Sequence, residues 1–323
     1  MSVLIQKTNI IEIINLKKHF KEIKAVDGIS LEIPKGELFS ILGPNGAGKT
    51  TLVKMLTTIL TPTDGDANID NFSIKKQKEN IVKIIGVCPQ DVVIYDVLTA
   101  EENVEFVARM NGIPKEEAHL KAIELLEKFG IAGKQMWAKK FSGGMKRRLN
   151  LAMSLVHEPK ILFLDEPTAG LDPQARRLVW DFISDLKQKD ITIILMTHDM
   201  VEADSLSDHI AIIDQGKLIA QGTPMELKEK YGSDNVLEII TFKEEEMELL
   251  EKQINLKNMP FIADCKVIGK RKLLIAFQGG LRNLEHILSL IIENIEEVEN
   301  MKFRQNSLED VFLNLTGRRL RDK

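Results

Sequence analysis

A glycine-rich stretch at residues 43–50 constrains the fold of this chain more than any other feature. It follows the apolar run Leu38–Leu42, typical of a buried strand, and precedes the run Thr51–Leu56, typical of a helix. Glycines let consecutive backbone N–H groups turn toward one anion, and the helix adds its own free N–H groups at the same point. The pattern predicts a phosphate-binding loop between a strand and a helix. The residues expected at the phosphates are Gly43, Pro44, Asn45, Gly46, Ala47, Gly48, Lys49, Thr50 and Thr51.

Two side chains at the end of this loop predict nucleotide chemistry. Lys49 would reach the β- and γ-phosphates, and the hydroxyl of Thr50 would bind Mg²⁺. The alternative is a glycine-rich turn that binds nothing, and the motifs described below make it the weaker interpretation. We therefore expect the chain to bind a nucleoside triphosphate.

The composition narrows the class of protein. With 323 residues, of which 44% are hydrophobic and 28% charged, the chain is long enough for two domains. A net charge of −4 and a pI near 6.0 argue against general nucleic-acid binding, which requires a basic face. Cys88 and Cys265 lack metal-ligand spacing, so we expect reduced thiols in a cytoplasmic protein. No apolar run has the length of a membrane span, and residues 1–24 lack the core of a signal peptide.

Up to about Gln221, short β-branched runs alternate with amphipathic helical stretches. Between Thr99 and His157 helical periodicity continues without a strand signal, which predicts a helical subdomain at about residues 96–158. Strands with both faces apolar, joined by helices, indicate a parallel sheet covered on both sides and hence an α/β fold. Besides Leu38–Leu42, strands are expected at Ile81–Val87, Ile161–Leu164, Ile191–Met196, His209–Ile213 and Lys217–Ala220.

The end of the chain predicts a second, smaller domain. Gly222-Thr223-Pro224 and Gly232-Ser233 punctuate the boundary. The runs between Val236 and Arg304 then follow the order β-α-β-β-α-β, with a hairpin turn at Gly269-Lys270, which is the ferredoxin-like pattern. We therefore predict a nucleotide-binding domain at residues 1–231 and a C-terminal α+β domain at residues 232–323.

Two carboxylates follow the apolar strand at Ile161–Leu164. In a parallel sheet they would lie at the same edge as the phosphate loop. Asp165 is placed to hold Mg²⁺, directly or through water. Glu166 suits a general base that orients and deprotonates an attacking water. The alternative is a strand that simply ends in a polar turn.

A serine cap and two glycines, Ser142-Gly143-Gly144, precede another helix and offer a second set of N–H groups for an anion. With this signature the chain resembles the nucleotide-binding subunit of an ABC transporter, over about Ile10 to Tyr231. The resemblance implies a P-loop NTPase fold, with a RecA-like parallel sheet, an antiparallel β part and a helical insertion. It also implies ATP and Mg²⁺ as cofactors. The motifs occur in the family's order: the phosphate loop, Gln90, Ser142-Gly143-Gly144, Asp165-Glu166, Ala169-Gly170-Leu171-Asp172 and Thr197-His198.

The resemblance assigns roles to residues outside the phosphate loop. Gln90 would contact Mg²⁺ or the attacking water, and His198 would hydrogen-bond the γ-phosphate and hold the water. Ser142, Gly143 and Gly144 would contact ATP bound to a second copy, and Asp172 would lie at that dimer seam. Phe20 falls where the family places an aromatic ring that stacks on adenine, which suits a ring against a purine. The alternative for Phe20 is a core position in an N-terminal strand.

The signature departs from the family at two positions. The common form is Leu-Ser-Gly-Gly-Gln, whereas this chain has Phe141 and Met145. The glutamine amide is lost, but Ser142 and the backbone donors remain, so binding across a dimer is still expected. The basic side chains nearby either raise the local potential for a triphosphate or form a solvated helix face. They are Lys139, Lys140, Lys146, Arg147 and Arg148.

The resemblance narrows further at the C-terminus, where Ser307–Phe312 and Leu315-Thr316-Gly317-Arg318 are similar to the tail of daunorubicin-type drug-resistance ATP-binding subunits. It implies the ATP-hydrolysing subunit of an exporter of drug-like or lipophilic compounds. Such a subunit would act as a homodimer, or with a second ABC ATPase subunit, on a separate integral-membrane permease. It would be cytoplasmic and peripheral on the inner face of the cell membrane, with no nucleic-acid partner.

Two rival functions remain at this point. One is a soluble ABC ATPase acting on ribosomes or nucleic acid, although a single phosphate loop and the absence of a long coiled coil disfavour the best-known types. The other is a GTPase or kinase that shares only the phosphate loop. No Asn-Lys-x-Asp guanine motif occurs in the sequence, and the serine-glycine signature would then have no explanation.

Overall fold

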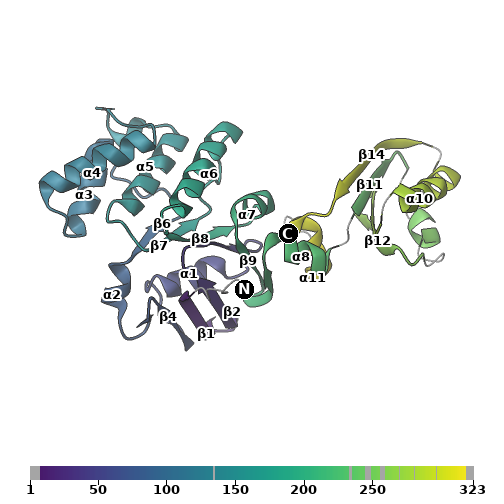
Figure 1. The fold of residues 1–323 in the computed structure, drawn as a ribbon, viewed down its shortest axis with the longest axis horizontal. Helices are drawn as coiled ribbons and strands as arrows, with labels where there is room; N and C mark the ends of the chain where they lie inside the picture. Colours follow the sequence, from purple (N-terminus) through teal and green to yellow (C-terminus); the bar gives the residue numbers. More distant parts are fainter. Residues whose placement is uncertain are drawn as a thin grey trace, which may run out of the picture. The chain divides into compact units, whose positions relative to one another are not determined.

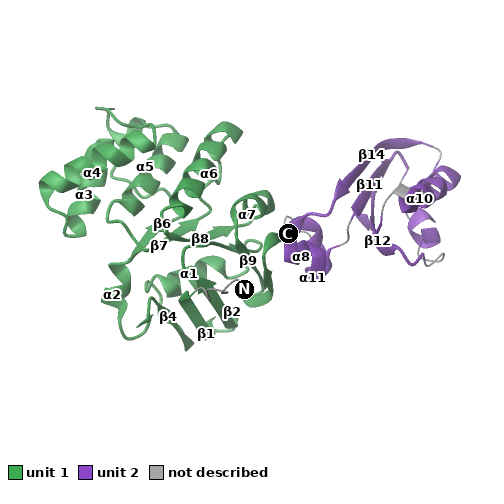
Figure 2. Ribbon diagram, in the orientation of Figure 1, with its two compact units in different colours: residues 1–224 green, residues 225–323 purple. Residues whose placement is uncertain are grey.

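The structure is a computed structural model, and it describes residues 8–133, 135–232, 235–243, 249–254, 259–268, 270–279, 281–295 and 297–317. The chain divides into two compact units, residues 1–224 and 225–323 (Figure 2). The predicted boundary at residue 231 lies at the end of helix α8 (Pro224–Tyr231). Each unit is described by itself.

A six-stranded sheet forms the centre of the first unit, with the strand order β10-β9-β3-β8-β7-β6 (Figure 1). All neighbours are parallel except β9 and β10, which form a hairpin. The expected strands are therefore present, except for the first part of the one at Ile81–Val87, and the parallel sheet is confirmed. The bounds are β3 Leu38–Leu42, β6 Ile85–Cys88, β7 Ile161–Asp165, β8 Thr192–Thr197, β9 His209–Asp214 and β10 Lys217–Gly222.

The sheet is covered on both faces because its strands are apolar at successive positions. Phe163 on β7 points into a core shared with α1 (Lys49–Leu56) and an antiparallel sheet. Its neighbours Leu162 and Leu164 point into a second core, formed with the helices α3 (Ala100–Met110), α4 (Lys115–Lys128), α5 (Gly143–Leu155) and α6 (Pro173–Lys187). All three side chains are fully buried. This is the pattern of a strand with a hydrophobic layer on each side.

The antiparallel sheet has the strand order β2-β1-β4-β5. Alternating apolar residues such as Ile11 and Ile13 on β1 are buried, which anchors one face of this sheet to the core. The resemblance implies such a part, but sequence periodicity did not locate its strands. Their bounds are β1 Asn9–Phe20, β2 Ile23–Pro34, β4 Asp64–Ile69 and β5 Phe72–Ser73.

The predicted helical insertion contains α3 (Ala100–Met110), α4 (Lys115–Lys128), the 3-10 helix Ala138–Lys140 and α5 (Gly143–Leu155). Figure 1 shows α3, α4 and α5 grouped together. Helix α3 starts with a capping box, in which Thr99 accepts a bond from the backbone N–H of Glu102 and Glu102 accepts one from that of Thr99. The helices α6 (Pro173–Lys187) and α7 (Met200–Leu206) follow after β7 and β8.

One predicted strand is wrong in its first part. We expected a strand at Ile81–Val87, but Lys78–Val82 forms the short helix α2, and β6 begins at Ile85. The fully buried side chain of Ile81 packs into the same core as α1 and the antiparallel sheet. A short apolar run has the same appearance in a strand as in one buried turn of helix, so periodicity does not separate them.

The second unit contains an antiparallel sheet with the order β12-β13-β11-β14. Residues 249–254 and α10 (Leu281–Asn294) are helical and pack on one face of the sheet, as the β-α-β-β-α-β order predicts. Gly269 of the predicted turn, and Arg318 of the C-terminal motif, lie outside the described residues. The strands are β11 Asn235–Thr241, β12 Ile262–Ile268, β13 Lys272–Phe277 and β14 Val298–Gln305.

The C-terminal motif forms helix α11 (Leu308–Thr316) of the second unit. Ser307 caps the helix, and Asp310 closes the capping box and forms a two-point ion pair with Arg304, at 2.5 and 2.8 Å.

Among the described residues, no helix has the length and apolar character needed to cross a membrane. The sheets confirm the predicted fold class, a parallel α/β core with antiparallel β parts.

Candidate functional site

The phosphate loop connects β3 to α1, as predicted, and its glycines meet two different demands. Gly48 has φ +103°, and a Cβ there would lie 2.2 Å from the carbonyl oxygen of Ala25. A Cβ on Gly43 would lie 2.2 Å from the carbonyl oxygen of Ile213. Residues with side chains at these positions would displace the loop, so glycine is required by close backbone packing as well as by conformation.

Lys49 is folded back into this loop. Its ammonium donates to the carbonyl oxygens of Gly43, at 2.6 Å, and Pro44, at 3.1 Å, and the residue is only 5% exposed. Burial lowers the pKa of Lys49, while the nearby charges of Glu166 and Asp165 act to raise it. The loop therefore holds the Lys49 ammonium against two neutral carbonyl oxygens, and a phosphate oxygen can replace these partners.

The predicted metal-binding pair lies beside Lys49. The hydroxyl of Thr50 and a carboxylate oxygen of Asp165 are 3.5 Å apart. Burial, and then the charge of Glu166, raise the pKa of Asp165, while Lys49 and Thr50 lower it. A hydroxyl beside two neighbouring carboxyl groups fits Mg²⁺, which takes hard oxygen ligands. Within the described residues no cluster of three His, Cys, Asp or Glu side chains is placed to hold a metal.

The side chain of Glu166 lies between two other predicted site residues. Gln90 Nε2 donates to one carboxylate oxygen at 2.9 Å, and His198 Nδ1 lies 2.8 Å from the other. Because a carboxylate accepts, Nδ1 carries the proton in this contact. Glu166 is 7% exposed and has φ +47°, a left-handed conformation that is uncommon outside glycine. The ends of β6, β7 and β8 thus bring Gln90, Glu166 and His198 together.

A cavity of about 550 Å³ opens at the phosphate loop. Besides the loop, it is lined by Gln90 and Glu166, and by residues that the sequence analysis did not select. These additional residues are Ile23, Lys24, Ala25, Gln215 and Gly216. The missed residues come from β2 and the β9–β10 turn, and no local motif distinguishes them.

Other predicted residues lie elsewhere in the first unit. Ser142 caps α5 by accepting from the N–H of Met145 at 3.3 Å, and it is exposed with Gly143. Asp172 caps α6, accepting from Gln174 and Ala175 at 3.0 and 2.9 Å. Among the described residues, neither the Ser142–Gly143 pair nor Asp172 lines the cavity at the phosphate loop.

Phe20 ends β1 and is 46% exposed, with Lys18 Nζ 5.2 Å from the centre of its ring. The alternative core position is therefore wrong.

The basic cluster near the signature does not behave as one group. Lys139 and Lys140 are exposed, and Lys146 pairs with Asp96 at 3.3 Å. Arg147, in contrast, is 3% exposed, so it does not belong to a solvated helix face. Sequence analysis missed its position because the helical pattern of α5 places charged residues on several sides.

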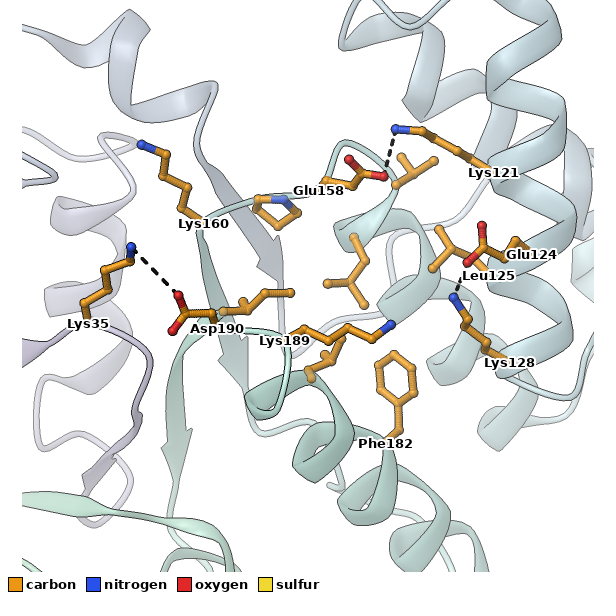
Figure 3. Close-up of a pocket in the computed structure, with 15 residues that line it drawn as sticks. Lys35, Lys121, Glu124, Leu125, Lys128, Glu158, Lys160, Phe182, Lys189 and Asp190 are labelled. Carbon is orange, nitrogen blue, oxygen red and sulfur yellow. Dashed lines mark hydrogen bonds and ion pairs between the residues drawn. The ribbon is translucent and has the colours of Figure 1, made fainter.

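Figure 3 shows a second cavity, which has a volume of about 460 Å³. It lies near the starts of β7 and β8, whereas the phosphate loop follows the end of β3. Its floor is apolar and includes Phe182, and most of its charged rim is paired. Lys121 contacts Glu158 at 3.0 Å. Further pairs join Lys35 to Asp190, Lys128 to Glu124, and Lys160 to Asp70. The paired rim makes this cavity a poorer match for a polyphosphate than the loop.

Comparison with known proteins identifies the family that this chain resembles. The family model described as ABC transporter matches residues 26–169. Among curated relatives, the linearmycin resistance ATP-binding protein LnrL of Bacillus subtilis (strain 168) is 34% identical over 310 residues, 95% of this chain and 98% of the relative. The daunorubicin/doxorubicin resistance ATP-binding protein DrrA of Streptomyces peucetius is 36% identical over 321 residues, 97% of this chain and 94% of the relative.

Solved structures give the same result for the first unit's fold. The ATP-binding cassette MJ0796, in a dimeric post-hydrolysis state bound to ADP and Pi, matches with a TM-score of 0.61 and 27% identity, over 66% of this chain and 98% of that one. CbiO1 from Clostridium perfringens, part of the ABC transporter complex cbiONQ, matches with a TM-score of 0.62 and 30% identity, over 78% of this chain and 96% of that one.

Proposed function

Because this chain belongs to the ABC transporter family of ATP-binding proteins and is an ABC-type ATPase, we propose that it energises the export of drug-like or lipophilic compounds. In this proposal two copies enclose ATP between them and act on a separate membrane permease. The relatives named as resistance proteins match over 94–98% of their own length, which favours an exporter over a soluble factor acting on ribosomes or nucleic acid.

The observation that carries the catalytic part is the convergence of Gln90, Glu166 and His198 beside the phosphate loop. In the proposed mechanism, the Glu166 carboxylate accepts a proton from the attacking water, and His198 and Gln90 hold that water and the carboxylate in place. Lys49 moves its hydrogen bonds from loop carbonyls to phosphate oxygens. Thr50 and Asp165 would hold Mg²⁺, with Gln90 as a further contact. When bound there, the ion would supply positive charge beside the phosphates.

The signature residues support the two-copy part of the proposal. Ser142 and Gly143 are exposed at the start of α5, and a Cβ on Gly143 would meet nothing within 4 Å. The N–H groups at this helix start are thus open to an anion from outside the chain. The Met145 side chain replaces a polar one, so the backbone donors and Ser142 would make most of this contact.

A partly apolar surface between Gln90 and the end of α3 supports a membrane partner. Val93, Val97 and Met110 are 59, 66 and 72% exposed, and Tyr95 and Phe106, also exposed, make an edge-on ring contact with each other. A group of exposed apolar residues on one part of a soluble domain marks an interaction surface. In the proposal the permease contacts this surface, next to the loop that carries Gln90.

The test is export that depends on both proteins. The chain is expressed with the membrane protein that copurifies with it from detergent extract, and efflux of an anthracycline is followed in inverted or intact vesicles. We expect ATP-dependent efflux, abolished when Glu166 is replaced by glutamine. Copurification with ribosomes in place of a membrane protein, and no efflux, would reject the exporter proposal.

A further inference from the structure

Arg147 has a contact pattern that the sequence analysis did not anticipate. It lies in the second turn of α5, and its guanidinium is directed into the protein, where the residue is 3% exposed. A guanidinium carries five N–H donors in a fixed planar arrangement. The structure gives all five of them a partner, and every partner is a backbone carbonyl.

The five carbonyls belong to the two chain segments that carry Gln90 and Glu166. Nη1 donates to Pro89 at 2.7 Å and to Gln90 at 2.9 Å. Nη2 donates to Asp165 at 2.8 Å and to Glu166 at 2.6 Å, and Nε donates to Pro167 at 2.9 Å. These segments follow β6 and β7, which are neighbouring parallel strands. One side chain therefore ties together the backbones of both segments beyond the end of the sheet ladder.

The bonds to Asp165, Glu166 and Pro167 surround a strained position. Glu166 has φ +47°, and its N–H is held by the carbonyl of Met196 at 2.9 Å. Non-glycine residues keep a left-handed backbone only where the surroundings fix it, and such residues gather at functional sites. Arg147 holds the peptide groups on both sides of this residue and so fixes the direction in which the Glu166 carboxylate leaves the backbone.

We infer that Arg147 is a positioning residue, which holds Gln90 and Glu166 in one arrangement and connects both to α5, the helix that Ser142 caps. The inference rests on the proposed roles of Gln90 and Glu166. Arg147 itself does not touch the nucleotide, because its five donors face the protein backbone. A displacement of α5 would therefore move the backbone segments of both Glu166 and Gln90, because Arg147 bonds to both of them.

Lysine at this position keeps the charge but not the geometry. Its single ammonium has three donors, which cannot span five carbonyls on two segments. Arg148→Lys is the matched control, since Arg148 is the next residue of α5 and also binds backbone carbonyls. Those carbonyls are Phe129 at 2.8 Å and Gly144 at 3.4 Å, which belong to the helical insertion.

The first measurement is hydrogen exchange by mass spectrometry on the full chain without nucleotide. In Arg147→Lys, peptides covering residues 85–95 and 161–172 should exchange at least about tenfold faster than in the parent, whereas Arg148→Lys leaves them within about twofold. This readout does not depend on what Glu166 does. Unchanged exchange in both peptides of a folded Arg147→Lys protein would overturn the inference.

The second measurement separates kcat from KM. Misplacing a reacting group by about 1 Å costs on the order of 100-fold in rate, so kcat of Arg147→Lys should fall about 10- to 100-fold, with KM for ATP within about threefold. A kcat within about twofold of the parent, or a loss confined to KM, would overturn the inference. If Arg147→Lys does not fold, Arg147→Gln takes its place. If neither folds while Arg148→Lys does, Arg147 is a folding determinant and the positioning role is rejected. A Glu166→Gln protein with the parent rate would instead reject the base assignment and leave the exchange result standing.

Discussion

Replacing Glu166 by glutamine tests the centre of the proposed mechanism, because the change removes proton acceptance and little else. The two carboxylate oxygens now accept from Gln90 at 2.9 Å and His198 at 2.8 Å. A glutamine amide has the same shape, and its oxygen can still accept from one of these partners. The other partner can present an acceptor, by rotation of the Gln90 amide or by the other tautomer of His198. We therefore expect the local packing to survive.

The size of the effect follows from the role of a base. A positioned general base contributes about 10²- to 10⁴-fold, so hydrolysis should fall by that factor, which is about 3–5 kcal/mol of barrier. ATP binding should remain within about threefold of the parent or improve, since one negative charge leaves the neighbourhood of Lys49 and Asp165. Because the charge of Glu166 raises the pKa of Asp165, that carboxyl should also ionise at lower pH in the variant.

The assay combines three measurements on the purified chain with Mg²⁺: phosphate release at saturating ATP, ATP affinity by calorimetry, and mass by light scattering after size exclusion. Glu117→Gln is the matched control, since Glu117 is an exposed residue of α4 paired with Lys121 at 3.3 Å. We expect Glu166→Gln to bind ATP without turnover and to elute as a dimer with ATP and as a monomer without it. The control should hydrolyse ATP at the parent rate.

Two results would refute different parts of this reasoning. Hydrolysis at the parent rate in Glu166→Gln would remove Glu166 as the base. A variant that binds ATP and is inactive, yet stays monomeric at high protein concentration, would contradict a site shared between two copies of the isolated chain.

Three further changes test other parts of the site. Lys49→Ala removes the ammonium inside the phosphate loop and should weaken ATP binding strongly; an affinity within threefold of the parent would contradict the loop assignment. Phe20→Ala should weaken ATP binding by about 1 kcal/mol of stacking, and Phe20→Trp should not; an equal loss in both variants would argue against stacking on adenine. Burial raises the pKa of Glu202, which accepts bonds from Thr168 and Trp180. Protonation of Glu202 therefore stabilises the folded state. This stabilisation is complete below the ordinary pKa of Glu and is lost as the pH rises through the raised pKa. The glutamine in Glu202→Gln cannot ionise. The urea concentration at the midpoint of unfolding should therefore fall less in this variant than in the parent as the pH rises between the ordinary and the raised pKa. Identical pH profiles of the two midpoints would show that Glu202 is not protonated on folding.

The sequence by itself predicted the features that depend on neighbours along the chain. The strand, loop and helix at residues 38–56 follow from an apolar run, glycines and a helical run. The helical insertion follows from periodicity, and Asp165 and Glu166 follow an apolar strand. In each case the residue types within about ten positions determine the local structure, and a parallel sheet then brings the strand ends to one edge.

Only the tertiary structure decided the remaining features. Ile81 is helical because of the core into which its side chain packs, which a short apolar run does not reveal. The lining of the cavity at the phosphate loop by β2 and the β9–β10 turn depends on how distant segments meet. Arg147 is the clearest example, because its partners lie 18 to 58 positions away in the sequence. All of them are backbone carbonyls, which every residue carries, so no residue type marks them and only the folded chain brings them to one guanidinium.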